Sequence, residues 1–490
     1  MWVWATWCGS GWGFFPPGKH HGGPPVGWIQ CPDGAPYVTT RSQRTEWNVF
    51  GLNKPEEESF VWPTGTTAAV LASFKAHSLL RESARIATSV PTEEETAYCK
   101  AVFLNRHRLR YTCPTLDLYS SRGREQFDRA LAGLNKKAGP GLGAFQRNAT
   151  IGSALGWDGQ QFDPSAVEQL RGYVQAKLTS LGQGGTPDDI RAFIKDEPHK
   201  RTKVRDRRFR LIMVMSLEDQ MVDRILFQEW SAVESDNVMS IPGKSGWSPL
   251  PFGYRLFDRA FPGKTLATDC SAFDWTVPEW AVAMLMDLRL EMVVPDDGFE
   301  RYAHAVRARF RQVLGPDCVI RLPDGQRLSQ ERYGLMKSGW FRTIAENSAI
   351  QVLTHSLAWM RSHPGQYLPN MWTMGDDVVM GWSDLYDQAC FERALATTGV
   401  LVKHGLQVRE FAGFRFGRGC VSPLYPEKHA FMLRFVPPDM KEQIADSYQL
   451  FYSLADRDDR APLDRVFAAS RIAPYLAAMW ARGGSFALSA

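Results

Sequence analysis

The sequence predicts an α+β fold in which short β-hairpins are flanked by amphipathic helices. Two apolar, β-prone segments enclose Gly375-Asp376-Asp377, a pattern typical of a hairpin with a tight turn. The run LEDQMVDRILFQEW at 217–230 has its apolar residues at helical spacing. With 44% hydrophobic and 22% charged residues, the chain of 490 residues has enough apolar material for a large core.

The first half of the chain is predicted to be mostly helical. Residues 1–45 are rich in Gly, Pro and Trp and are interpreted as an extended arm or ordered loop, whereas helical patterns dominate 65–182. The sequence AFIKDEPHK begins as a strand that runs into a basic segment at 195–210. FRLIMVMS at 209–216 is a second predicted strand, and the helix at 217–230 follows it.

In the second half, strands and helices are predicted to alternate. An apolar helix at 278–294 is opened by a proline, which the first helical turn favours. Residues 295–333 are interpreted as a more polar insert, and 334–360 as a glycine-containing turn that leads into a helix. The acidic hairpin at 371–381 precedes a short strand at 411–417, and the C-terminal part is mainly helical.

Two acidic pairs, about a hundred residues apart, are the candidate metal ligands. Asp376 and Asp377 lie at the hairpin turn, and Asp269 and Asp274 follow another short β-like run in TLATDCSAFDW. Taken alone, either pair is also typical of a solvated loop or a helix cap. Two acidic strand ends that meet in space can hold a pair of divalent cations, which clamp the attacking and leaving oxygens of a phosphoryl transfer.

The positive charge of the chain is concentrated in one segment. Residues 195–210, KDEPHKRTKVRDRRFR, contain eight Lys or Arg and three Asp or Glu, whereas the whole chain has a formal net charge of +4. The remainder is therefore close to neutral. Such a concentration indicates a phosphate-binding surface rather than a general contribution to solubility.

Cysteine usage and hydropathy exclude several classes of protein. The eight Cys form no Cys-x-x-Cys pair and no Cys/His ligand spacing, so neither a zinc site nor a disulfide framework is expected. A reducing, cytosolic setting fits this usage. No segment approaches the ~18 apolar residues of a transmembrane helix. The N-terminus lacks the basic start of an ordinary signal peptide.

Taken in order, these motifs resemble those of the RNA-dependent RNA polymerases of positive-strand RNA viruses. The amino-acid sequences of the individual motifs are most similar to those of the sobemovirus, barnavirus and polerovirus group. The resemblance covers about residues 195–430 and is carried by KDEPHKRTKVRDRRFRLI, SLEDQMVDRILF, DCSAFDWTV and GLMKSGWFRTIAENS, followed by Gly-Asp-Asp. It implies a right-hand polymerase with fingers, palm and thumb, whose palm is a small antiparallel sheet backed by helices.

The resemblance also implies a division of the chain along this architecture. The expected parts are an N-terminal arm and fingers extension at 1–150, fingers with a basic segment that admits NTPs at 151–215, a first palm part at 216–289, a fingers insertion at 290–333, a second palm part at 334–425, and a thumb at 426–490.

By the same resemblance, Asp269 and Asp376 hold two Mg²⁺ or Mn²⁺ ions, and Asp377 is a supporting ligand. Asp274 is expected to point towards the sugar of the incoming nucleotide and to bind Asn347 through a hydrogen bond. This pair would test for the ribose 2′-hydroxyl, the group by which a protein tells RNA from DNA. Reverse transcriptases carry a bulky aromatic in the place of Asp274, so ribonucleotides are the expected substrates.

Ser338 and Gly339 correspond to the second palm motif of the family, a pliable turn between the template and the following helix. Thr343 lies four residues before Asn347, so both are expected on one face of that helix, at the nucleotide.

Four basic residues match positions that bind and guide the triphosphate of the incoming NTP in this family, namely Lys195, Lys200, Lys203 and Arg210. Arg210 is the candidate for the β/γ-phosphate contact, because a guanidinium binds phosphate through two parallel hydrogen bonds. The other basic residues of the segment are equally expected to touch the template backbone.

Residues after the hairpin supply the remaining candidates. Lys403 falls near the lysine that protonates departing pyrophosphate in the family, His404 is an equally placed rival, and a plain surface lysine is an alternative. The segment 411–417, with Lys428 further on, resembles the hairpin that grips the primer end, although its phenylalanines fit a core equally well.

The expected reaction is attack of a primer or initiating 3′-hydroxyl on an NTP α-phosphate, templated by RNA, for viral genome replication and transcription. The expected partners are an RNA template, a primer or nascent strand, NTPs, other viral replication proteins and, if initiation is protein-primed, a protein primer. The expected location is the host cytoplasm, at membrane-associated replication complexes. Two alternatives stand beside it: a reverse transcriptase-like polymerase, and a non-catalytic RNA-binding or capsid protein that uses 195–210 alone. Capsid arms are usually terminal, whereas this segment is internal.

Overall fold

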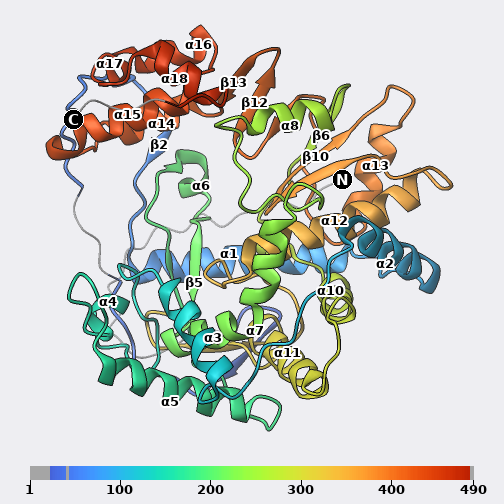
Figure 1. Ribbon diagram of the computed structural model, residues 1–490. Helices are drawn as coiled ribbons and strands as arrows, with labels where there is room; N and C mark the ends of the chain where they lie inside the picture. Colours follow the sequence, from blue (N-terminus) through green and yellow to red (C-terminus); the bar gives the residue numbers. More distant parts are fainter. Residues whose placement is uncertain (1–22, 40–43, 486–490) are drawn as a thin grey trace.

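The computed structural model describes residues 23–39 and 44–485. Figure 1 shows the C-terminal helices at one end of the molecule and a helix-rich region at the other. A small sheet, together with α12 and α13, lies at one side between these two ends. The part of the predicted N-terminal arm at 1–22 lies outside the described residues. The mixture of helices and small sheets confirms the predicted α+β class.

A three-stranded antiparallel sheet carries the acidic hairpin. Its order is β6 (Thr265–Thr268), β10 (Asp377–Gly381) and β9 (Met371–Met374). The predicted hairpin is therefore confirmed, and its turn lies at 375–376. Three helices pack together on this region, namely α10 (Glu279–Glu291), α12 (Thr343–Ser362) and α13 (Gln388–Ala396). The arrangement is the small sheet backed by helices that was expected of a palm.

A second sheet joins segments that lie up to three hundred residues apart. Its order is β1 (Trp28–Cys31), β8 (Arg327–Gln330), β7 (Val319–Arg321), β3 (Ile190–Ile194) and β5 (Leu211–Val214). Trp28 anchors its edge, because its ring packs on Phe74 and its indole N–H donates to Ser78 at 3.0 Å. The predicted strand at 209–216 is confirmed in a shorter form.

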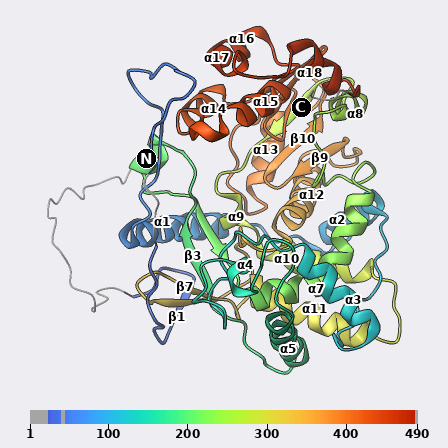
Figure 2. The same ribbon diagram turned by 60° about the vertical axis from the view of Figure 1, so that its left-hand side comes forward.

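Helices surround this second sheet (Figure 2). Their starts follow local signals: a capping box of Thr92 and Glu95 opens α2, and Asp163 caps α5 before Pro164. The helices are α1 (Thr67–Ile86), α3 (Ser121–Ala132), α4 (Ile151–Ala154), α5 (Pro164–Ser180), α7 (Leu217–Asp236), α9 (Phe273–Thr276) and α11 (Phe299–Leu314), with α2 (Glu93–His107) packed on α12. Helix α8 (Gly253–Ala260) lies away from this sheet, where its Phe257 contacts Trp372 of β9.

The C-terminal part is mainly helical, as predicted. A three-stranded sheet of β11 (Glu410–Phe411), β12 (Phe414–Gly417) and β13 (Cys420–Pro423) leads into α14 (Pro426–Leu433), α15 (Lys441–Phe451), α16 (Arg457–Arg460), α17 (Asp464–Phe467) and α18 (Pro474–Ala481). Phe50 and Leu52 from the N-terminal region pack into the core of these helices.

Two segments contain local structure that the sequence did not predict. The strand that runs into the basic segment is β3, and the basic segment itself contains a two-residue strand, β4 (His199–Lys200), which pairs with β2 (Phe60–Val61), and the short helix α6 (Arg201–Arg205). The polar insert at 295–333 contains the amphipathic helix α11, whose inner face is buried around Phe310 and Arg309. The sequence concealed that face, because Arg309 is buried through an ion pair with Asp223 of α7 at 2.7 Å.

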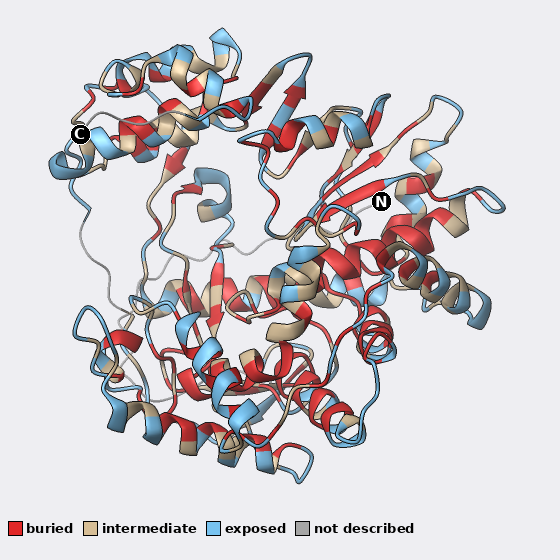
Figure 3. Ribbon diagram, viewed as in Figure 1, coloured by how far each residue is buried: buried red, intermediate tan, exposed pale blue. Residues whose placement is uncertain are grey.

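Four charged residues form a buried ion-pair network beneath the start of α12. Arg289 of α10 and Arg342 each pair with Glu346 of α12, at 2.9 and 2.8 Å, and with Glu234 of α7. Burial alone would raise the pKa of Glu234, but the two arginines outweigh it and hold this pKa at about 2. The network therefore fixes α12 against α7 and α10. Figure 3 shows α12 as one of the most completely buried helices.

Candidate active site

Asp269 and Asp377 face each other across two paired strands. Val378 of β10 pairs with Thr268 of β6 in antiparallel register, so the next opposed positions are Asp377 and Asp269. Directly opposed side chains lie on the same face of a sheet. The two carboxylates that the sequence places 108 positions apart thus meet at one edge of the palm sheet.

The turn that carries Asp376 is tied to α12. The Ser348 hydroxyl accepts a hydrogen bond from the Gly375 N–H at 2.9 Å, and the Gln351 side chain donates to the Asp376 backbone carbonyl at 3.1 Å. Gly375 adopts φ +63°, a conformation that disfavours residues with a side chain. The position of Asp376 is therefore set by a helix that the buried arginine network itself holds in place.

The acidic side chains are crowded. The pKa of Asp377 is raised to about 7, first by partial burial of its carboxyl group and then by the negative charges of Asp376 and Asp269. Lys403 opposes this rise. Within the described residues, no group of three or more His, Cys, Asp or Glu side chains is placed so that it could hold a metal ion by itself. The site is an open cluster of negative charge.

Lys403 belongs to this cluster, and His404 does not. The segment around Lys403 runs along β6, where its N–H donates to the Asp269 carbonyl at 3.0 Å. The Lys403 ammonium forms an ion pair with the Asp269 carboxylate at 2.5 Å. His404 points to Glu392 of α13, at 3.1 Å. The structure thus separates two neighbours that the sequence leaves equivalent.

The predicted pair of Asp274 and Asn347 is confirmed. The Asn347 amide donates to Asp274 at 2.7 Å. Burial raises the pKa of Asp274, and the hydrogen bond from Asn347 opposes the rise. The other amide atom of Asn347, its Oδ1, is buried and has no hydrogen-bond partner among the residues that the structure describes. An unpaired buried acceptor is costly, so this atom is suited to a ligand that donates a hydrogen bond.

Ser338, Gly339 and Thr343 are held by backbone contacts. Ser338 accepts from the Met213 N–H at 3.1 Å, and Gly339 donates to the Met213 carbonyl at 3.0 Å. A Cβ at Gly339 would lie 2.5 Å from that carbonyl oxygen, so only glycine fits. Thr343 shares a helix face with Asn347, but its hydroxyl donates to the Lys337 carbonyl at 2.6 Å.

Two basic residues of the 195–210 segment lie close enough to influence Asp274. The charges of Arg210 and Lys195 lower its pKa, against the dominant effect of burial. Both residues also bind Glu197, at 3.1 Å each. Arg210 is largely exposed, so its guanidinium is available to a ligand. The carboxylate of Glu197 therefore holds these two cations close together.

The other two predicted basic residues divide between the palm and the C-terminal helices. Partial burial lowers the pKa of Lys203, and so do the nearby charges of Lys403 and Arg210. Lys203 therefore lies near Lys403 and Arg210. Lys200 instead lies over the ring of Tyr425, which precedes α14, at 5.7 Å from the ring centroid. The predicted triphosphate residues thus do not form one compact cluster.

The segment 411–417 is a hairpin, and its three phenylalanines are core residues. Phe411, Phe414 and Phe416 are buried in a cluster with Trp247 and Trp372. Lys428 lies on α14, near enough to Glu197 to lower its pKa. The sequence left both interpretations open, and the structure shows that packing accounts for the phenylalanines.

Sequence reasoning missed two residues that position the site, Gln351 and Glu197. Gln351 is three residues after Ser348, so one face of α12 presents both to the acidic turn. That spacing was a signal which could have been used. Glu197 lies between lysines in KDEPHK, and no local pattern reveals which cations it binds.

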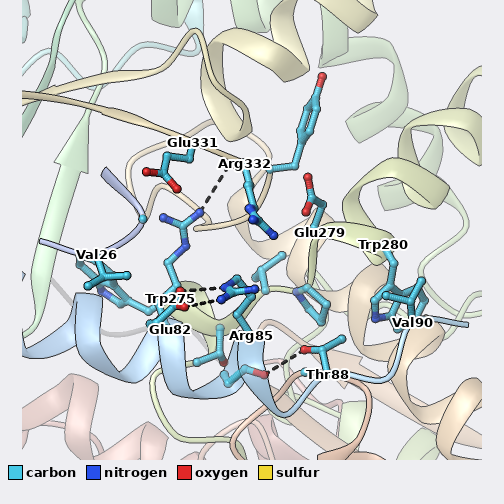
Figure 4. Close-up of a pocket in the computed structure, with 18 residues that line it drawn as sticks. Val26, Glu82, Arg85, Thr88, Val90, Trp275, Glu279, Trp280, Glu331 and Arg332 are labelled. Atoms are coloured by element: carbon cyan, nitrogen blue, oxygen red, sulfur yellow. Dashed lines mark hydrogen bonds and ion pairs between the residues drawn. The ribbon is translucent and has the colours of Figure 1, made fainter. Parts of the chain in front are cut away.

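A separate cavity of about 560 Å³ lies between α1 and the start of α10 (Figure 4). Trp275, which directly follows Asp274, lines it. Figure 4 shows Arg85 bound to Glu82. Arg81 donates to the backbone carbonyl of Arg332 at 3.4 Å. Three arginines and three glutamates line this cavity, so its charges balance.

Carboxylates lie at the ends of two antiparallel strands, with helical regions on both sides, as the right-hand polymerase fold requires. A solved structure described as a Sicinivirus 3Dpol RNA dependent RNA polymerase superposes with a TM-score of 0.66 over 90% of this chain and 94% of that one. At 15% sequence identity, the likeness shows the fold. The predicted right-hand fold is confirmed.

The sequence comparisons place the chain within a particular family. The model of the viral RNA-directed RNA-polymerase family matches residues 82–247 and 303–420, which is more than half of the chain. The chain belongs to this family. The predicted resemblance is confirmed by this match.

Curated relatives come from plant viruses. The chain is 31% identical over 355 residues to the replicase polyprotein P2AB of Southern bean mosaic virus, covering 67% of this chain and 34% of the polyprotein. It is 28% identical over 363 residues to Protein P1-P2 of Pea enation mosaic virus-1, covering 66% and 28%. The chain therefore spans about a third of the length of these relatives.

Proposed function

We propose that this chain catalyses RNA-templated RNA synthesis for viral replication and transcription. The 3′-hydroxyl of a primer, nascent strand or initiating nucleotide attacks the α-phosphate of an NTP, and pyrophosphate leaves. The observation that carries this proposal is the meeting of Asp269, Asp376 and Asp377 at two paired strand ends, beside the pair of Asp274 and Asn347. Family membership supports it.

The acidic residues fit two divalent cations, Mg²⁺ or Mn²⁺. Asp269 and Asp376 would hold them and Asp377 would support them, because hard cations prefer carboxylate oxygens. The crowding that raises the pKa of Asp377 is relieved when a cation neutralises its neighbours. Mg²⁺ is usually held by one or two carboxylates plus substrate phosphates, which suits an open cluster. When bound, the cations stabilise the charge on the attacking and leaving oxygens.

Basic residues complete the proposed reaction. Arg210, Lys195 and Lys203 contribute positive charge towards the triphosphate, with Arg210 at the β/γ-phosphates. Lys403 carries a proton on its Nζ beside Asp269 and delivers it to the departing pyrophosphate. Lys200, on the side of Tyr425, follows the RNA backbone instead.

Asn347 makes ribonucleotides the favoured substrates in this proposal. Its unpaired Oδ1 accepts a hydrogen bond from the ribose 2′-hydroxyl, while its amide N–H₂ keeps Asp274 in place. A deoxynucleotide leaves that acceptor unpaired. This arrangement opposes the alternative of a reverse transcriptase-like enzyme.

We further infer that synthesis takes place in the host cytoplasm, at membrane-associated complexes with other viral replication proteins. The cysteine usage supports a reducing compartment, since the seven cysteines in the described residues are all unpaired. No helix in the described part of the chain is long and apolar enough to span a membrane. Fractionation of infected cells, with the chain followed by antibody, tests this location.

The proposed function is tested by incorporation of labelled NTPs on a single-stranded RNA template, with and without Mg²⁺. We expect product that depends on both the template and the cation. Omission of the template is the matched control. Failure to make product with any RNA template, with either Mg²⁺ or Mn²⁺, would contradict the proposal.

A further inference from the structure

A hollow of about 820 Å³ lies at the far end of β9 from the acidic turn, and we name it the basic hollow. Its walls are formed by the C-terminal end of α2, the loop before α8, α8 itself and the start of β9. Since a strand rises about 3.3 Å per residue, the start of β9 is roughly 10 Å from its end at the turn. The basic hollow is therefore separate from the acidic cluster.

The charge of this hollow is of one sign. Arg106, Arg108, Lys244 and Arg259 line it, together with His107, and none of its lining residues is Asp or Glu. The cavity of Figure 4 differs, because its arginines and glutamates balance. Cations gathered without carboxylates repel one another, and a bound anion relieves this repulsion.

The partners of these cations are mostly uncharged. Arg106 donates to the backbone carbonyls of Leu368 and Pro369, and Arg108 to the side chain of Asn105 at 2.6 Å. Arg259 is exposed and has no ion pair within the described residues. The nearest acidic residue on α8, Asp258, is bound to Arg409 at 2.5 Å. The guanidinium charges are thus not neutralised.

Lys244 is the most unusual of the four. It is 1% exposed; its ammonium donates to the backbone carbonyls of Val238, at 2.7 Å, and Ile241, and lies 4.6 Å from the centroid of the Trp372 ring, without an acidic partner in the described residues. Burial lowers its pKa to about 7. Buried lysines are rare unless they are paired with an acid. An anion in the hollow would provide the missing negative charge.

We propose that the basic hollow binds phosphate groups, either those of an RNA strand or those of a free triphosphate. Guanidinium groups bind phosphate oxygens through paired hydrogen bonds, and the hollow offers three of them around one ammonium. The volume accommodates a nucleotide-sized ligand. This inference does not depend on the proposed catalytic activity, because binding can be measured without turnover.

The test uses Arg259→Glu and Arg108→Glu in the full chain. Neither arginine forms an ion pair in the described residues, so these substitutions break no ion pair that stabilises the fold. Arg307→Glu on α11 is the matched control: it is also an exposed arginine, it removes the same charge, and it lies outside the hollow. Unchanged melting temperatures verify that the variants are folded. Binding of a fluorescent single-stranded RNA is measured by anisotropy at several salt concentrations, and binding of inorganic tripolyphosphate by calorimetry.

If an RNA strand occupies the hollow, each variant should weaken RNA binding roughly five- to tenfold. Each should also flatten the salt dependence by about 0.7 per lost contact, while the control stays within about twofold. If a free triphosphate occupies it, the loss should appear with tripolyphosphate. Wild-type binding of both probes by both variants would overturn the proposal, and so would an equal loss in Arg307→Glu.

Discussion

Charged residues serve opposite purposes in two neighbouring regions of this molecule. Beneath α12, Arg289 and Glu346 are almost fully buried and bind one another. At the ends of β6 and β10, the side chains of Asp269 and Lys403 also form an ion pair, but each is about half exposed. The same type of contact therefore occurs in a dry and in a wet environment.

The difference shows which charges are free to react. A buried pair cannot be broken without leaving an uncompensated charge in the interior, so it fixes the helix that carries Asn347, Ser348 and Gln351. An exposed pair contributes little to stability and is readily exchanged for other partners. The buried network thus determines where the site is, and the exposed carboxylates are left available for cations and substrate.

The largest expected effect on activity comes from a substitution of Asp376, one of the exposed carboxylates. Asp376→Asn should lower RNA synthesis by roughly 10³-fold, because it removes an anionic ligand worth several kcal/mol in the transition state. RNA affinity and the melting temperature should change little, since the side chain is exposed. Primer extension and RNA binding are measured on the same preparation. Near-normal incorporation would refute the two-metal assignment, and Asp377→Asn should be less severe.

The buried network should give the largest effect on stability. Glu346→Gln leaves Arg289 and Arg342 with one carboxylate fewer, and should lower the free energy of unfolding by about 3–5 kcal/mol. The matched control is Asp317→Asn, which breaks the exposed pair of Arg311 and Asp317 and should cost less than ~1 kcal/mol. Chemical denaturation measures both. Equal costs in the two variants would show that burial does not distinguish these pairs.

A smaller effect is expected on the choice of sugar. Asn347→Ala removes the proposed acceptor of the 2′-hydroxyl and should reduce the preference for ATP over dATP about tenfold, corresponding to one hydrogen bond of ~1.4 kcal/mol. The measurement is the ratio of kcat/KM for the two nucleotides. An unchanged ratio would mean that the 2′-hydroxyl is recognised elsewhere.

The smallest effects should separate the roles within 195–210. Arg210→Ala should raise the KM for NTPs roughly fivefold with RNA affinity nearly unchanged, because Arg210 lies near Asp274. Lys200→Ala should instead weaken RNA binding and flatten its salt dependence by about 0.7 for the one lost contact, because Lys200 lies on the side of Tyr425. Steady-state kinetics and salt titrations distinguish the two. Wild-type behaviour of both variants would identify the segment as a solvated surface.

Much of the candidate site could be predicted because its residues lie in short sequence motifs. The acidic hairpin depends on a local turn and local β-propensity, and the pair of Asp274 and Asn347 was expected from the resemblance. The prediction of buried positions failed for charged residues that are buried in ion pairs. Arg309 and Arg342 look like surface residues in the sequence, yet both are buried against acids from another helix.

The local structure of the basic segment was not predicted either. The strand that runs into it ends at Ile194, and the chain then forms the short helix α6. The cations of the segment contact Glu197 and Tyr425. Such contacts depend on residues that are distant in sequence.

By itself the sequence determined the α+β class, the acidic hairpin and the order of the motifs, because each of these depends on residues close together along the chain. Only the tertiary structure decided that Asp377 faces Asp269, that Lys403 rather than His404 reaches the carboxylates, and that Gln351 holds the acidic turn. Strand register and the packing of α12 set these contacts. Both are fixed by the burial of side chains from segments far apart in sequence, which no local pattern records.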